Sequence, residues 1–235
     1  MESHFFSERV MKTKKTIVYF VPGMAAGSEI FRNIFLPEER YQVIVLDWLI
    51  PKKKEDLVDY AQRMALRVEE PNSILVGVSF GGVVAQEMAQ FLTLKKLMII
   101  SSVKTRKELP RRMKIASATG AYKLIPTRLV LSVEDLTKFS IGPRSKKRLS
   151  LYQEYLHVRD EKYLDWALEK MVTWDRKEAV KGIIHIHGEK DGVFPIKYIS
   201  DCRIVQNGTH IMILVKGKEI SKMLLQIFKD RKSVV

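Results

Sequence analysis

The residues with the clearest chemical meaning run from Gly77 to Gly81 in the order Gly, Val, Ser, Phe, Gly. This G-x-S-x-G pattern lies between an apolar run, Ser73 to Val78, and a run with helical spacing, Gly82 to Leu92. Where a strand turns abruptly into a helix, the central serine is strained and exposed, and the residues two positions away must be glycines to avoid a clash. The pattern predicts that Ser79 is a nucleophile; the alternative is an ordinary strand-to-helix turn.

A serine hydroxyl is a poor nucleophile near neutral pH and needs an imidazole within hydrogen-bonding reach to accept its proton. Two later residues could complete such a site. Asp191 stands in a turn after the apolar run Ile183 to His187, and His210 follows the short run Cys202 to Val205. Both positions follow predicted strands, so both side chains could reach the same edge of a parallel sheet.

These features resemble the α/β-hydrolase superfamily, and the resemblance extends from Thr16 to Phe228. It implies a triad in the chain order Ser, Asp, His, with Ser79 as nucleophile, Asp191 as the orienting acid and His210 as the general base. The family often places its acid in a His-Gly-x-x-Asp string, which stands here at residues 187–191. Glu189 in the same turn is the competing acid.

The resemblance also implies two backbone amides that bind the oxyanion, and the candidates are the N–H groups of Met24 and Phe80. The family commonly has a His-Gly pair before the first of these amides, whereas this chain has Pro22-Gly23. The departure leaves the role possible, because the donor is a main-chain group. The alternative is that residues 22–27 form a plain loop.

The surrounding pattern predicts an α/β fold with a mostly parallel, doubly wound sheet. Strand-like and helix-like runs alternate along the first hundred residues. The predicted strands are 16–21, 41–46, 73–78, 97–101, 183–187 and 202–205. The predicted helices of this part are 28–35, 55–69, 82–92 and 218–230.

The alternation stops between residues 103 and 181, where helices are predicted over 111–124, 133–139, 149–157 and 161–172. In α/β-hydrolases a helical cap commonly occurs at this position and selects substrates. The resemblance therefore implies a helical cap insertion at 103–181, and a hydrolase core made of 1–102 and 182–235.

The formal net charge of +14 is large for 235 residues, and the segment 103–181 carries most of it. No nucleic-acid-binding motif accompanies the charge, so neither nucleic acid nor a membrane is expected as a partner. Basic residues of the predicted cap could instead steer a negatively charged acyl substrate towards the site. They include Arg111, Arg112, Lys146, Lys147 and Arg148.

The sequence favours a cytoplasmic protein. Its first fifteen residues lack the apolar core of a secretory signal, and no later run approaches the roughly 18 apolar residues of a membrane helix. The single cysteine, Cys202, excludes an internal disulfide framework and fits a reducing compartment. The oligomeric state is not determined by these features.

Two further pairs of residues have both a functional and a structural interpretation. Asp47 and Trp48 follow a predicted strand and could approach a substrate, although a turn or capping role for Asp47 is more common. His185 and His187 form an H-x-H pair that resembles two metal ligands, but no further ligands stand at suitable spacing. The expected chemistry needs neither a cofactor nor a metal.

The combined prediction is a serine hydrolase that cleaves a carboxylic ester or thioester through an acyl-enzyme on Ser79. A small-molecule acyl compound would be its substrate. The alternative is a catalytically silent ligand-binding receptor or scaffold, because a fold does not fix a function.

Overall fold

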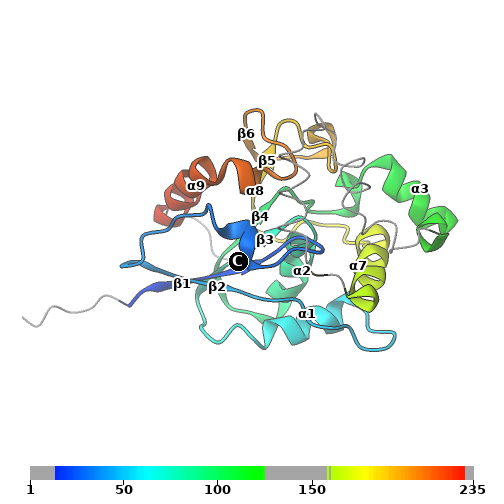
Figure 1. Ribbon diagram of the computed structural model, residues 1–235, viewed down its shortest axis with the longest axis horizontal. Coiled ribbons are helices and arrows are strands. Elements are labelled where there is room, and N and C mark those ends of the chain that lie inside the picture. Colours follow the sequence, from blue (N-terminus) through cyan, green and yellow to red (C-terminus); the bar gives the residue numbers. More distant parts are fainter. Residues whose placement is uncertain (1–13, 125–157, 159, 231–235) are drawn as a thin grey trace, which may run out of the picture.

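The computed structural model describes residues 14–124, 158 and 160–230, and its centre is one six-stranded sheet with helices on both faces (Figure 1). The strands are β1 (Thr16–Val21), β2 (Tyr41–Val45), β3 (Ser73–Val78), β4 (Leu94–Ile100), β5 (Ile184–Gly188) and β6 (Arg203–Val205). Their order is β2-β1-β3-β4-β5-β6, and every neighbouring pair is parallel. The predicted parallel α/β sheet is confirmed.

The strand order determines where a site can form. The chain adds β2 on one side of β1 and then returns to add β3 on the other side. At such a reversal the connections leave β1 and β3 in opposite directions, and a crevice opens at the carboxyl ends of the two strands. The loop after Val21 and the turn at Ser79 both lie at this edge.

Two apolar cores cover the two faces of the sheet, because successive side chains of a strand point to opposite faces. Val18 and Phe20 of β1 pack with α8 (Met212–Val215) and α9 (Gly217–Lys229). Tyr19 and Val21 pack with α1 (Leu57–Ala65) and α2 (Phe80–Met88). Figure 1 shows α9 and α1 on opposite sides of the sheet, as the predicted doubly wound arrangement requires.

The described part of the segment 103–181 contains η3 (Arg106–Glu108), α3 (Arg111–Thr119), η4 (Ala121–Leu124) and α7 (Glu161–Thr173). The single helix predicted over 111–124 is wrong, because Gly120 adopts a left-handed conformation with φ of 70° and ends α3. The helix predicted over 161–172 is confirmed as α7. The helices predicted over 133–139 and 149–157 lie outside the described residues.

Helix α7 packs directly on the core of the sheet layer. The Trp166 ring lies 4.2 Å, centroid to centroid, from the Tyr60 ring of α1, and its indole N–H donates to the Glu55 carbonyl at 2.8 Å. Tyr163, one turn earlier, lies 5.2 Å from the Trp48 ring. Residues 163 and 166 therefore belong to the same apolar core as α1 and α2. The division into core and cap stays a prediction.

The helix predicted over 28–35 is also wrong, since only the short 3-10 helix η1 (Ser28–Phe31) forms. After η1, the N–H groups of Arg32 and Ile34 make local turn bonds, while Asn33 and Phe35 bond to α8 and α9. The Asn33 side-chain amide donates to the Leu214 carbonyl at 2.7 Å, and the Phe35 N–H donates to the Ser221 hydroxyl at 2.9 Å. The Phe35 N–H therefore has a long-range acceptor where a longer helix would give it a local carbonyl.

The remaining elements differ from their predicted ranges mainly at their ends. Helix α1 begins at Leu57 because the Asp56 carboxylate caps it by accepting the Asp59 N–H at 2.8 Å, and it ends at Ala65, before the predicted end. Helix α2 begins at Phe80, directly after Ser79, and continues into η2 (Ala89–Phe91). The short helix η5 (Ile196–Tyr198) completes the described elements. In the described part of the chain, no helix is both long and apolar enough to cross a bilayer.

Removing the Trp166 side chain tests whether α7 belongs to the folded core. Trp166→Ala should lower the free energy of unfolding by about 3–5 kcal/mol, because it removes a buried ring and leaves a cavity. Lys162→Ala, an exposed change on the same helix, should alter it by less than about 0.5 kcal/mol. Urea titration followed by circular dichroism measures both values. Equal stability of the two variants would show that α7 does not contribute to the core.

Candidate active site

Ser79 occupies a strained turn between β3 and α2. Its φ of 53° and ψ of −120° lie in a region that residues with a side chain rarely adopt. The strain is accompanied by close packing of the backbone on both sides of the serine. A Cβ atom on Gly77 would lie 2.3 Å from the Gly81 carbonyl oxygen, and one on Gly81 would lie 2.2 Å from the Pro22 carbonyl oxygen. Both glycines are therefore sterically required, as the pattern predicted.

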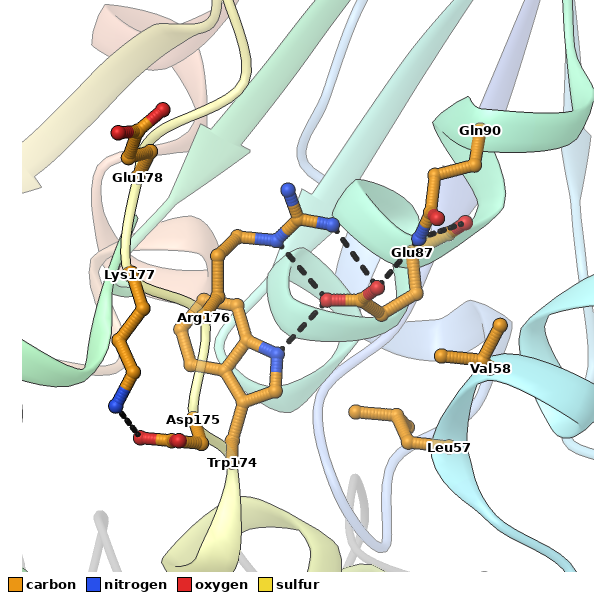
Figure 2. A pocket seen from close by; sticks show the side chains of 9 residues that line it. All are labelled: Leu57, Val58, Glu87, Gln90, Trp174, Asp175, Arg176, Lys177 and Glu178. Atoms are coloured by element: carbon orange, nitrogen blue, oxygen red, sulfur yellow. Dashed lines mark hydrogen bonds and ion pairs between the residues drawn. The ribbon is translucent and has the colours of Figure 1, made fainter.

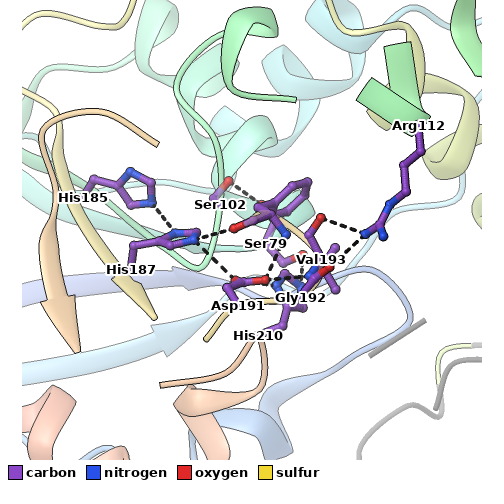
Figure 3. A network of polar contacts seen from close by, with 10 residues as sticks. Ser79, Ser102, Arg112, His185, His187, Asp191, Gly192, Val193 and His210 are labelled. Carbon is purple, nitrogen blue, oxygen red and sulfur yellow. Dashed lines mark hydrogen bonds and ion pairs between the residues drawn. The ribbon is translucent and has the colours of Figure 1, made fainter. Parts of the chain in front are cut away.

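The structure brings Ser79, His210 and Asp191 into one hydrogen-bonded chain (Figure 3). The Ser79 Oγ lies 2.9 Å from His210 Nε2, and His210 Nδ1 lies 2.9 Å from Asp191 Oδ2. A carboxylate can only accept, so Nδ1 carries the imidazole proton and Nε2 is free to accept from the serine. This tautomer is the one that a general base beside Ser79 needs.

Asp191 is almost completely buried and is held by the backbone of its own turn. Its Oδ1 accepts the N–H groups of Val193 at 2.8 Å and Phe194 at 2.9 Å. Burial alone would raise the pKa of this carboxyl, but the adjacent His210, His187 and the Phe194 N–H outweigh burial and hold that pKa below its usual value. The side chain is therefore a carboxylate near neutral pH.

Glu189, the competing acid, lies elsewhere in the turn. It is exposed, and its Oε2 accepts the Asn207 N–H at 2.8 Å. In the described structure it is Asp191 that contacts His210.

The loop after β1 lies against the nucleophile. A Cβ atom built on Gly23 would lie 3.6 Å from the Ser79 Cβ, so Met24 belongs to a loop that touches the turn. The Trp48 indole and the Ala26 N–H both donate to the Gly23 carbonyl at 3.1 Å. Phe80 begins α2, where the first N–H groups of a helix lack intrahelical acceptors. The oxyanion roles of the Met24 and Phe80 amides stay a prediction.

Trp48 packs near the nucleophile turn, whereas the Asp47 side chain is exposed. The Trp48 ring lies 5.7 Å from the ring of Phe80, the residue after the nucleophile. Asp47 is exposed, and its carbonyl accepts the Arg67 guanidinium. Of the two, Trp48 is the residue that packs next to the nucleophile turn.

His185 and His187 form a buried pair beside the acid. His187 Nε2–H donates to the Phe194 carbonyl at 2.8 Å, so its Nδ1 is unprotonated and accepts from His185 Nε2–H at 3.0 Å. His187 Nε2 also lies 3.6 Å from Asp191 Oδ2. Among the described residues no cluster of three or more His, Cys, Asp and Glu could hold a metal ion. The pair therefore supports the turn that carries Asp191.

Sequence reasoning missed two contacts of the site. The Ser102 hydroxyl donates to the Ser79 carbonyl at 2.7 Å, and the Arg112 guanidinium donates to the Gly192 and Val193 carbonyls, at 3.0 Å each. Neither residue belongs to a motif, and Arg112 lies 80 residues before its first partner. Local spacing contains no signal for such contacts.

A separate hollow of about 510 Å³ lies near the other end of α2 (Figure 2). The Glu87 carboxylate there accepts the Trp174 indole N–H at 2.9 Å and the Arg176 Nε and Nη2 at 3.0 and 2.9 Å. These bonds attach the segment after α7 to α2, so the Glu87 carboxylate already has structural partners. The lining residues are Leu57, Val58, Glu87, Gln90, Trp174, Asp175, Arg176, Lys177 and Glu178. None of them belongs to the Ser79 chain.

Comparisons with known proteins agree on the fold. No family model matches the chain, and no curated protein matches its sequence. MenH from S. aureus superposes with a TM-score of 0.73 at 15% identity, covering 94% of this chain and 96% of that one. An esterase, EaEST from Exiguobacterium antarcticum, gives 0.65 at 18% identity over 92% and 93%. A bromoperoxidase from Bacillus anthracis gives 0.67 at 16% identity over 92% and 93%. The chain has the α/β-hydrolase fold.

The strain at Ser79 predicts that glycine is more stabilising than alanine at this position, which is the reverse of the order inside a helix. Ser79→Gly should be more stable than Ser79→Ala by about 1 kcal/mol, because glycine adopts this conformation without a Cβ clash. At Gln62, exposed in α1, the order should be the ordinary one, with Gln62→Gly less stable than Gln62→Ala. Thermal unfolding of the four variants compares them. The ordinary order at residue 79 would mean that the turn is not strained.

The buried histidine pair predicts a pH dependence of stability. Burial, reinforced by neighbouring positive charge, lowers the pKa of His185 well below its usual 6.5, and burial also lowers the pKa of His187. The unfolded chain therefore binds more protons below about pH 6.5, so the free energy of unfolding should fall as pH drops from 7 to 5. Each neutral histidine contributes a slope of up to about 1.4 kcal/mol per pH unit.

His185→Gln removes the contribution of His185 to the pH dependence of the free energy of unfolding. Glutamine keeps an amide donor for His187 and does not titrate. The slope between pH 7 and pH 5 should fall by up to about 1.4 kcal/mol per pH unit. Urea unfolding at several pH values measures it. The Asp191 contribution does not interfere, because its loss begins only near the usual carboxyl pKa of 3.8 and below. An unchanged slope would show that His185 is not held neutral.

Proposed function

We propose that the protein is a serine hydrolase that cleaves a carboxylic ester or thioester through an acyl-enzyme on Ser79. The observation that carries the proposal is the hydrogen-bonded chain from Ser79 through His210 to Asp191, at the carboxyl edge of the sheet. Its two links are 2.9 Å each, and the nucleophile turn is strained in the way that exposes a serine. The shared fold with a solved esterase supports a hydrolase.

The proposed mechanism follows from the positions of the three side chains. His210 Nε2 takes the Ser79 proton as Oγ attacks the acyl carbonyl, and the resulting imidazolium returns that proton to the departing alcohol or thiol. Asp191 stabilises the imidazolium through Nδ1–H. A water molecule then attacks the acyl-enzyme, and His210 again acts first as base and then as acid.

The oxyanion of each tetrahedral intermediate would be bound by the N–H groups of Phe80 and Met24. The Phe80 amide begins α2, so the positive end of the helix dipole lies beside the developing negative charge. Met24 lies in the loop that contacts Ser79. Formation and hydrolysis of the acyl-enzyme both need only the side chains and amides of this chain, the substrate and water.

The substrate class we propose is a small acyl compound, and a negatively charged one would suit the net charge of +14. Of the basic residues that could steer it, Arg111 and Arg112 lie on α3, while Lys146, Lys147 and Arg148 lie outside the described residues. The second candidate function, a silent receptor, has less support. A receptor has no need of a strained serine hydrogen-bonded to an imidazole.

Removal of each triad side chain tests the proposal. Ser79→Ala and His210→Ala should each lower kcat for a p-nitrophenyl ester by about 10⁴- to 10⁶-fold, and Asp191→Asn by somewhat less, because the acid does not touch substrate. Glu189→Ala, in the same turn, should retain nearly full activity. Stopped-flow or plate assays with esters of increasing acyl length, and with acyl-CoA thioesters, measure these values and rank the substrates.

A fluorophosphonate probe provides the control that does not depend on the choice of substrate. The wild-type protein should be labelled and Ser79→Ala should not. A folded wild-type protein that neither reacts with the probe nor hydrolyses any ester or thioester would favour the receptor. Full activity of Asp191→Ala together with an inactive Glu189→Ala would reassign the acid.

A further inference from the structure

The Arg112 side chain reaches from α3 to the turn that carries Asp191 (Figure 3). One guanidinium nitrogen, Nη2, lies 3.0 Å from the Gly192 carbonyl oxygen and 3.0 Å from the Val193 carbonyl oxygen. Arg112 is exposed, and α3 belongs to the segment that the sequence predicts to be a cap. The contact therefore joins two parts of the chain that are distant in sequence.

The two carbonyls belong to the same peptide units as the amides that hold the acid. One unit consists of the Gly192 carbonyl and the Val193 N–H, and the next consists of the Val193 carbonyl and the Phe194 N–H. Both N–H groups donate to Asp191 Oδ1, at 2.8 and 2.9 Å. The described chain contains no cis peptide, and in a trans peptide the N–H and C=O point in opposite directions.

The arrangement places opposite charges at the two ends of the same two dipoles. Each peptide unit has a dipole of about 3.5 D, with its negative end at the oxygen. The Arg112 cation lies at the oxygen ends, and the Asp191 carboxylate lies at the N–H ends. A rotation of either unit would break one bond to the cation and one to the carboxylate together.

We propose that Arg112 is a positioning residue of the triad, which fixes the two peptide units that orient Asp191 and thereby couples helix α3 to the catalytic acid. The proposal rests on the proposed hydrolase function. It assigns to Arg112 an effect on the chemical step, in contrast to the steering of anionic substrates, which would act on their encounter with the protein.

The next carbonyl of the turn, that of Phe194, differs from those of Gly192 and Val193 in the residue that holds it. The Phe194 carbonyl accepts from His187, which is fully buried and fixed on β5. The Gly192 and Val193 carbonyls receive the Arg112 bonds on the exposed side, where water competes for them. A guanidinium is planar and permanently charged, and its hydrogen bonds to a carbonyl are stronger than those of neutral donors.

Kinetics on a neutral p-nitrophenyl ester separate positioning from steering. Arg112→Ala should lower kcat by about 10- to 100-fold and leave KM within about twofold, since a misplaced acid affects the reaction and not ground-state binding. Arg112→Lys keeps a cationic donor and should recover much of the lost kcat. Arg111→Ala, the adjacent charge, and Lys114→Ala, which removes a 2.8 Å bond from α3 to the Lys107 carbonyl, should retain wild-type kcat.

Proton NMR tests the same proposal without turnover. The His210 Nδ1–H, bonded to Asp191, should give a downfield resonance that His210→Ala removes and that serves as its assignment. In Arg112→Ala this resonance should shift upfield or broaden by exchange with water, and in Arg111→Ala it should be unchanged. Circular dichroism shows whether each variant is folded. If the alanine variant is not folded, Arg112→Gln carries the test, because its shorter neutral side chain removes the cation from the Gly192 and Val193 carbonyls.

The outcomes distinguish the inference from the function on which it rests. A wild-type kcat and an unchanged resonance in Arg112→Ala would overturn the positioning role, even if Ser79-dependent hydrolysis is observed. A loss confined to KM or to kcat/KM for anionic esters would overturn it in favour of steering. A wild-type protein without hydrolysis or fluorophosphonate labelling would overturn the proposed function, and the NMR comparison would still decide whether Arg112 orients Asp191.

Discussion

The strained turn at Ser79 is the constraint on which the candidate site depends. A φ of 53° at a residue with a side chain is unfavourable, and it occurs here within a tightly packed backbone. The same geometry requires glycine at positions 77 and 81. It also places the serine directly before the first turn of α2, within hydrogen-bonding distance of His210. The position of the nucleophile is thus fixed by the fold, before any substrate binds.

A second set of contacts places the base and the acid relative to that turn. Asp191 and His210 come from different loops. The acid is held by N–H groups of its own turn, and the base is held by its bonds to Ser79 and Asp191. The acid turn is bonded to the buried His187 on one side and to the exposed Arg112 on the other. Burial keeps the two histidines of β5 neutral, so they act as fixed hydrogen-bonding groups and leave the carboxylate as the charged partner of His210.

Local patterns were sufficient to predict the strands and the nucleophile turn. The resemblance to α/β-hydrolases pointed to Asp191 and His210, which the structure brings into one hydrogen-bonded chain with Ser79. Strands buried on both faces are continuous apolar runs, and the two glycines around Ser79 have a steric cause that is visible in sequence. The patterns failed where distant partners decide the conformation. Asn33 and Phe35 bond to α8 and α9 where a longer helix was predicted, and Gly120 divides the helix predicted over 111–124. No spacing indicates that Arg112 meets the acid turn.

The central claim is that a covalent acyl-enzyme forms on Ser79, and trapping that intermediate tests it most directly. Acid quenching during turnover of a p-nitrophenyl ester or a thioester, followed by peptide mass spectrometry, locates any acyl group on the chain. The account predicts a mass increase equal to the acyl group on the peptide that contains Ser79, and its absence in Ser79→Ala. Hydrolysis that proceeds with no adduct on Ser79, or with the adduct on another residue, would contradict the account.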